Sequence, residues 1–153
     1  MKVLSALLVS VFAGSLAMAG SIDQDLVNVK WATECLKDPS SGVFANSLSV
    51  FKDDGSFQII NYEYAGTDCS GKASKEEKTD AKYEADSKTQ EFSFEMEMDQ
   101  QGTKLLAKGK GVYLLPATKD VLTLTINTIE VYSGTQKVYE QAKPQTTVLK
   151  KLP

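Results

Sequence analysis

The chain has 153 residues, with 17 basic and 20 acidic side chains and a formal net charge of −3. All of its basic residues are lysines, because the sequence contains neither arginine nor histidine. This composition argues against Ser-His-Asp and Cys-His catalysis, His-ligated zinc and arginine-based phosphate recognition. The acidic excess also argues against a nucleic-acid partner. We therefore expect a protein that is not an enzyme and carries no cofactor or metal ion.

The first 19 residues have the pattern of a cleavable signal peptide. Lys2 is followed by an apolar run from Val3 to Leu16 and by the small-x-small end Ala17-Met18-Ala19. Cleavage would leave residues 20–153 as a single domain, periplasmic or secreted. No later stretch approaches the ~18 apolar residues of a membrane span. We expect this domain to be a monomer.

Strands and turns are predicted for most of the remaining chain, after a polar lead-in at 20–27 that is either frayed or a single helical turn. The turn Asp53-Asp54-Gly55 indicates a β-hairpin between the strands 43–51 and 56–64. Within the strand 56–64 the apolar residues change face midway, which indicates either a bulge or burial on both faces.

The clearest strand signal is the sequence EFSFEMEM at residues 91–98. Its strict alternation predicts a half-buried strand with the aromatic and methionine side chains inward and the glutamates in water. The segment 69–80 is rich in lysine and acids and is expected to be a solvated loop. The expected strands are 28–35, 43–51, 56–64, 79–86, 89–99, 103–115, 121–132 and 135–149. Because short turns join nearly all of them, the sequence predicts an all-β, up-and-down antiparallel β-barrel of about eight strands.

The two cysteines, Cys35 and Cys69, are expected to form one disulfide in an oxidising compartment. Such a bond would remove loop-closure entropy worth roughly 3–4 kcal/mol. The alternative is a reactive thiol pair. It has little support, since the chain has no C-x-x-C motif and no histidine to lower the pKa of a thiol.

Aromatic and methionine residues supply the candidates for ligand binding. Trp31, the only tryptophan, either plugs one end of the barrel or contacts a ligand. A second group either fills the core or lines a cavity for an apolar molecule, because eight strands is the size at which one small ligand fits. Its members are Tyr62, Tyr64, Tyr83, Phe92, Phe94, Met96 and Met98. The carboxylates show neither a catalytic pair nor calcium-loop spacing.

The order of these residues resembles a known family. Trp31 and Cys35, then the aromatic residues of 51–64, then Cys69 are similar to the opening of disulfide-tied lipocalin-like β-barrels, and in particular to the extracellular barrel domains of the adenomatosis-polyposis-coli-down-regulated type. The likeness spans about residues 29–69. Val29 stands where the lipocalin signature has glycine, and the late arginine of that signature has no counterpart.

The resemblance implies a lipocalin-like barrel that binds fatty-acid-like or other apolar molecules, and it carries over no catalytic residue. We therefore expect a periplasmic or secreted barrel that binds a small apolar, lipid-like molecule. The alternative is a non-catalytic protein-binding or inhibitor module that acts through its outer surface and loops, above all through residues 69–80.

Overall fold

The computed structural model describes residues 22–39, 41–141 and 143–153, so the predicted leader lies outside the described residues. The described part of the chain is all-β, as predicted. Its strands are β1 (Lys30–Ala32), β2 (Leu36–Lys37), β3 (Phe44–Phe51), β4 (Ser56–Tyr64), β5 (Lys75–Asp86), β6 (Glu91–Gln100), β7 (Thr103–Leu114), β8 (Val121–Ser133), β9 (Gln136–Gln141) and β10 (Gln145–Lys151).

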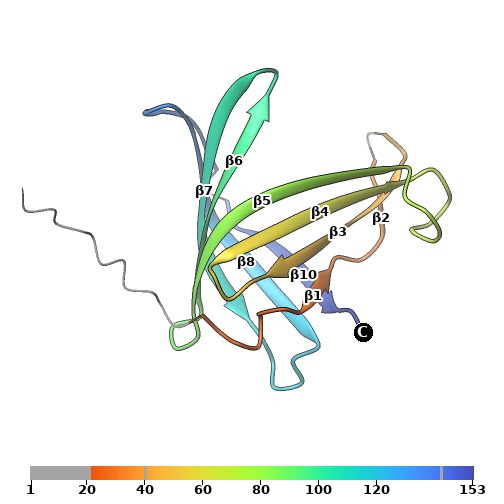
Figure 1. Ribbon diagram of the computed structural model, residues 1–153, viewed down its shortest axis with the longest axis horizontal. Coiled ribbons are helices and arrows are strands. Elements are labelled where there is room, and N and C mark those ends of the chain that lie inside the picture. Colours follow the sequence, from red (N-terminus) through yellow and green to blue (C-terminus); the bar gives the residue numbers. More distant parts are fainter. Residues whose placement is uncertain (1–21, 40, 142) are drawn as a thin grey trace, which may run out of the picture.

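Eight of these strands close into an antiparallel barrel (Figure 1). Their order is β1-β10-β8-β7-β6-β5-β4-β3, and β1 completes the circle by pairing with both β10 and β3. The short β2 adds to the edge of β3, and β9 pairs with the second half of β8. The predicted up-and-down barrel of about eight strands is therefore confirmed.

One end of the barrel is closed by a packed aromatic core. The rings of Phe51, Phe57, Tyr83 and Phe92 lie with their centroids 5.0–6.4 Å apart. The segment before β1 covers this end, where Leu26 is fully buried. Burial of these large apolar side chains is the main stabilising term for the fold.

The other end of the barrel is forked. The β5–β6 ladder stops at the pair Ala81–Met96, so Lys75–Asp80 of β5 pairs with β4 alone. In the same register the next pair would place Asp80 opposite Glu97. Like charges directly opposite each other on neighbouring strands are destabilising, and the ladder ends where they would meet.

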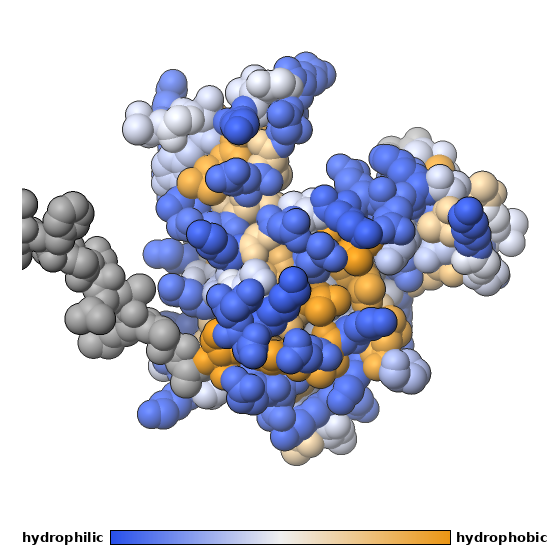
Figure 2. All heavy atoms as spheres, viewed as in Figure 1, coloured by the Kyte–Doolittle hydropathy of each residue, from blue (hydrophilic) through white to orange (hydrophobic). Residues whose placement is uncertain are grey.

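Two lobes result from this fork (Figure 1). We call β2, β3, β4 and the start of β5 the first lobe, and the end of β6, the start of β7, the end of β8 and β9 the second lobe. The space-filling view shows a deep notch between them (Figure 2).

Three sequence predictions require correction. The segment 69–80 is not a loop throughout, because Lys75–Asp80 belongs to β5. Its charged side chains alternate across an exposed strand, which hides the apolar signal of a barrel strand. The expected strand 135–149 is two strands, β9 and β10, on different halves of β8. The expected strand 28–35 is only β1, with β2 following it.

The hairpin turn at 53–55 is confirmed, with Gly55 at a φ of +78°. The change of face within β4 is explained by burial on both faces, because β3 and β4 pair without a register shift. Phe57 and Ile60 point to opposite faces of β4, and they are only 5% and 9% exposed.

Candidate functional site

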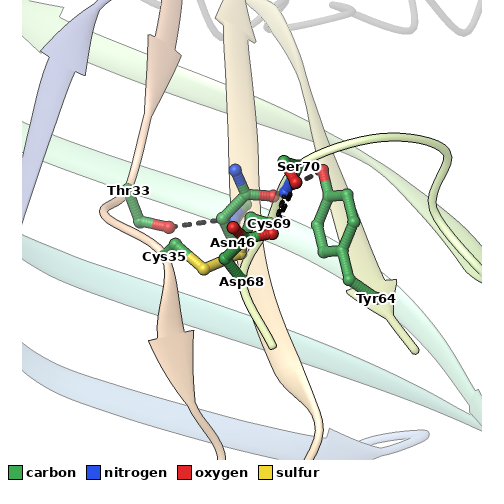
Figure 3. The surroundings of a disulfide bond; sticks show 8 residues. Thr33, Cys35, Asn46, Tyr64, Asp68, Cys69 and Ser70 are labelled. Carbon is green, nitrogen blue, oxygen red and sulfur yellow. Dashed lines mark hydrogen bonds between the residues drawn. A yellow bond between two sulfur atoms is a disulfide. The ribbon is translucent and has the colours of Figure 1, made fainter. Parts of the chain in front are cut away.

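The predicted disulfide is present and lies in the first lobe (Figure 3). Cys35 and Cys69 are joined with their Cα atoms 5.7 Å apart. Cys35 lies between β1 and β2, and Cys69 lies in the loop after β4, so the bond connects segments on the two sides of β3. Nearby, the Ser47 amide donates to Thr33 Oγ1 at 2.8 Å. The described residues contain no free cysteine.

The ligand candidates predicted from the sequence are distributed over three places. Trp31 is fully buried at the closed end, where its indole N–H donates to the Leu26 carbonyl at 3.3 Å. Phe92 is buried in the aromatic core. Tyr62 and Tyr64 lie on the outward face of β4, their ring centroids 6.5 Å apart, and so do not meet the inward residues of β6.

Phe94, Met96 and Met98 follow Phe92 along the inward face of β6 and lead from the core into the fork. All three are partly exposed, whereas Phe92 is 4% exposed. The Phe94 ring lies over Gly109 of β7, where an added Cβ would be 2.0 Å from Phe94 Cε1. The glycine therefore makes room for the ring between the core and the mouth of the barrel.

The inward face of the second lobe is apolar up to the pair Met98–Leu105 and becomes polar at the tip, where Gln100 pairs with Thr103. Met98 pairs with Leu105, Met96 with Ala107, and Ala107 with Val131 across β6, β7 and β8. We call this surface the apolar wall; it comprises Met96, Met98, Leu105, Ala107, Ile129 and Val131.

Sequence reasoning missed the members of the apolar wall on β7 and β8. The signal for β7 was present, because Leu105 and Ala107 alternate with lysine and leucine. On β8 it was obscured by the register shift opposite Lys110 and Gly111, which puts Ile126 and Ile129 on the same face although they are three residues apart.

The inward face of the first lobe is polar on β4 and β5, whereas Leu36 of β2 and Ala45 of β3 lie on the same face beside them. It carries Asn61 and Glu63 from β4 and Lys75, Glu77 and Thr79 from β5. The ammonium of Lys75 donates to Glu63 Oε1 at 3.2 Å and lies 3.7 Å from Glu77 Oε2. The hydrogen bond from Lys75 to Glu63, reinforced by both negative charges, raises the pKa of Lys75. We call this surface the polar wall, and the space between the two walls the mouth.

A second concave region, a cleft of about 670 Å³, lies outside the barrel. It is lined by the outward side chains of β5, β6 and β7, such as Lys82 and Glu84, together with the turn Asp53–Gly55. Its rim contains the ion pair Glu95–Lys108, at 2.6 Å. Of the predicted ligand residues Tyr83 and Phe94 border this cleft, whereas Met96 and Met98 do not, so the cleft is a different feature from the mouth.

Two further findings bound the chemistry of the described residues. They hold no group of three or more acidic or cysteine side chains placed to bind a metal ion. They also include no helix long and apolar enough to cross a membrane.

Comparisons with known proteins identify no relative: no protein-family model matches the chain, and neither the curated proteins nor the solved structures include a significant match. Function is therefore inferred from the mouth of the barrel itself.

Proposed function

We propose that this protein is a periplasmic or secreted carrier-type barrel that binds a small apolar, lipid-like molecule in its mouth, without catalysis. The observation that carries the proposal is the apolar wall. It presents partly exposed methionine, leucine, isoleucine and valine side chains to an open space, next to a core that is already packed. Concave apolar surfaces with a few polar groups opposite them are the usual form of small-molecule sites.

Methionine supports the same proposal. Met96 and Met98 have flexible thioether side chains that adapt to ligands of different shape. The resemblance of residues 29–69 to lipocalin-like barrels points in the same direction, and an intramolecular disulfide is compatible with the oxidising compartment that we propose.

The test is binding of a fluorescent apolar probe, N-phenyl-1-naphthylamine, combined with native mass spectrometry of protein purified from its own host. Leu105→Gln and Leu106→Gln form a matched pair, because these neighbours on β7 are both partly exposed but point to opposite faces. Losing half of a leucine burial should weaken binding about fivefold in Leu105→Gln, whereas Leu106→Gln should bind as the wild type does. Equal effects of the two substitutions, or a wild type that binds neither probe nor lipid, would refute the proposal.

A second candidate function, protein binding through the outer surface, is favoured by one observation. Val112, Leu114 and Val148 on the outward face of β7 and β10 are 42%, 55% and 48% exposed. Two threonines of β8, Thr123 and Thr125, separate them, so this part of the face is uncharged. Chemical cross-linking in the host should yield a defined heteromeric product that Leu114→Lys abolishes and Leu105→Gln preserves. Absence of such a product would exclude this candidate.

A further inference from the structure

The two walls of the mouth differ in charge as well as in polarity. On the inward faces of β6, β7 and β8, the positions from Phe92 to Met98, Leu105 to Gly111 and Leu122 to Val131 carry no ionisable side chain. On β10 the inward positions that face the mouth are Gln145 and Thr147. The charges on the described inward faces of the mouth therefore all belong to the polar wall.

The polar wall has one negative charge in excess. Of its ionisable members Glu63, Lys75 and Glu77, two are acids, and both lie within 4 Å of the single ammonium. The nearest neighbours of Lys75 on β5 point the other way: Lys78 pairs with Glu76 at 2.8 Å on the outward face. No unpaired cation of the described residues thus faces the mouth from β4 or β5.

This arrangement bears on the head group of an amphiphile. An alkyl chain lying along the apolar wall leaves its head group at the rim, opposite Glu63, Lys75 and Glu77. A carboxylate head group would find the ammonium of Lys75 already hydrogen-bonded to Glu63. The excess negative charge of the polar wall would also repel it. A cationic head group is instead attracted by this excess negative charge, and a hydroxyl can donate a hydrogen bond to Glu77, whose Oε2 lies 3.7 Å from the Lys75 ammonium.

We propose that the mouth selects single-chain amphiphiles with a cationic or neutral head group over fatty-acid-like carboxylates. This selectivity rests on the proposed function, since it concerns the same mouth. The chain also lacks arginine, the side chain best suited to hold a carboxylate by two hydrogen bonds.

The experiment uses three probes with one dodecyl chain: dodecyltrimethylammonium, dodecyl maltoside and dodecanoate, each as monomer, with titration calorimetry at pH 7.5 and low salt. The walls are exposed to solvent, so the attraction and the repulsion are each modest. Dodecyltrimethylammonium should bind about three- to tenfold more tightly than dodecanoate, and the ratio should shrink in 0.5 M salt because salt screens interactions between exposed charges.

Charge substitutions should reverse the preference. Glu63→Gln combined with Glu77→Gln leaves Lys75 as the only charge of the polar wall, so this variant should bind dodecanoate more tightly than dodecyltrimethylammonium. Glu76→Gln is the control, because Glu76 has the same charge and strand but points outward; it should keep the wild-type order. Circular dichroism checks that each variant is folded.

The outcomes separate the two proposals. If none of the three probes binds, the proposed function itself is wrong. If all bind and dodecanoate equals or exceeds the ammonium probe, or if Glu76→Gln shifts the order as much as the double variant, lipid binding stands and the selectivity is wrong.

Discussion

The fork of the barrel offers the sharpest test of how this sequence determines its shape. Asp80 and Glu97 are the first residues beyond the last β5–β6 pair, Ala81–Met96, and continued pairing would set their carboxylates on neighbouring positions of the outward face. Directly opposed Cβ atoms lie about 4.5–5.5 Å apart. Glu97→Lys replaces this repulsion with an attraction and should allow the two lobes to pair further toward the tip.

The size of the effect follows from the charges and their separation. Two unit charges about 5 Å apart in a water-like dielectric interact with about 0.8 kcal/mol. Replacing repulsion by attraction therefore changes the open-to-paired equilibrium by about 1.5 kcal/mol, or roughly tenfold. Thr79 and Met98 would form the next pair, on the inward face, so closure would also cover part of the apolar wall.

Amide hydrogen exchange of residues 97–100 measures this equilibrium. In Glu97→Lys the amides that face β5 should exchange about tenfold more slowly than in the wild type, and an apolar probe should bind more weakly. Glu84→Lys makes the same change of charge at an exposed β5 position that is already paired with Ser93, and should leave this exchange unchanged. Wild-type exchange rates in Glu97→Lys, or equal slowing in Glu84→Lys, would show that the opposed charges do not keep the fork open.

Three further predictions concern stability, each followed by the fluorescence of the buried Trp31 during denaturation. Gly111→Ala should destabilise the fold more than Gly109→Ala, because a Cβ at 111 would lie 2.0 Å from the backbone oxygen of Thr125, whereas a Cβ at 109 meets only the side-chain ring of Phe94. We expect Gly109→Ala to lower the free energy of unfolding by about 1–3 kcal/mol. A second substitution, Phe94→Leu, should restore part of this loss in Gly109→Ala but none of it in Gly111→Ala. Replacing both cysteines by serine should lower the free energy of unfolding by about 3–4 kcal/mol, because the disulfide closes a loop of 34 positions in the unfolded chain. A loss below about 1 kcal/mol would show that the first lobe unfolds independently of the rest of the barrel. Burial, reinforced by the charges of Asp54 and Asp53, raises the pKa of Tyr83 from 10.0 to about 12. Because the folded protein favours the neutral phenol, the free energy of unfolding should keep its full value below pH 10 and fall by at most about 2–3 kcal/mol between pH 10 and 12. Tyr83→Phe should make the free energy of unfolding less dependent on pH in this range.

The closed end of the barrel could be predicted from the sequence because each strand there has one clearly apolar face. In β6 every second residue from Phe92 to Met98 is apolar and every residue between is polar, so only one face can turn toward the core. The disulfide was predictable for a different reason: two cysteines after a predicted leader allow only one pairing.

The mouth could not be predicted in the same way. Residues 75–80 have charges on both faces, so no alternation distinguishes a strand from a solvated loop. The fork depends on the opposition of Asp80 and Glu97, which are 17 positions apart in sequence and become neighbours only once the β5–β6 register is known. The placement of Ile129 on the apolar wall depends on a register shift in β7–β8 that the residue pattern alone does not indicate.

The packed core and the proposed binding site lie in different halves of the same barrel. The inward positions of the closed half carry Phe51, Phe57, Tyr83 and Phe92, which belong to one buried cluster. Toward the fork the inward residues of the first lobe, such as Asn61 and Glu77, are polar or charged, and packing them against the methionines of β6 would cost their hydration. The apolar wall consequently stays uncovered within the single chain, and a ligand that offers an alkyl surface on one side and a polar group on the other would satisfy both walls at once.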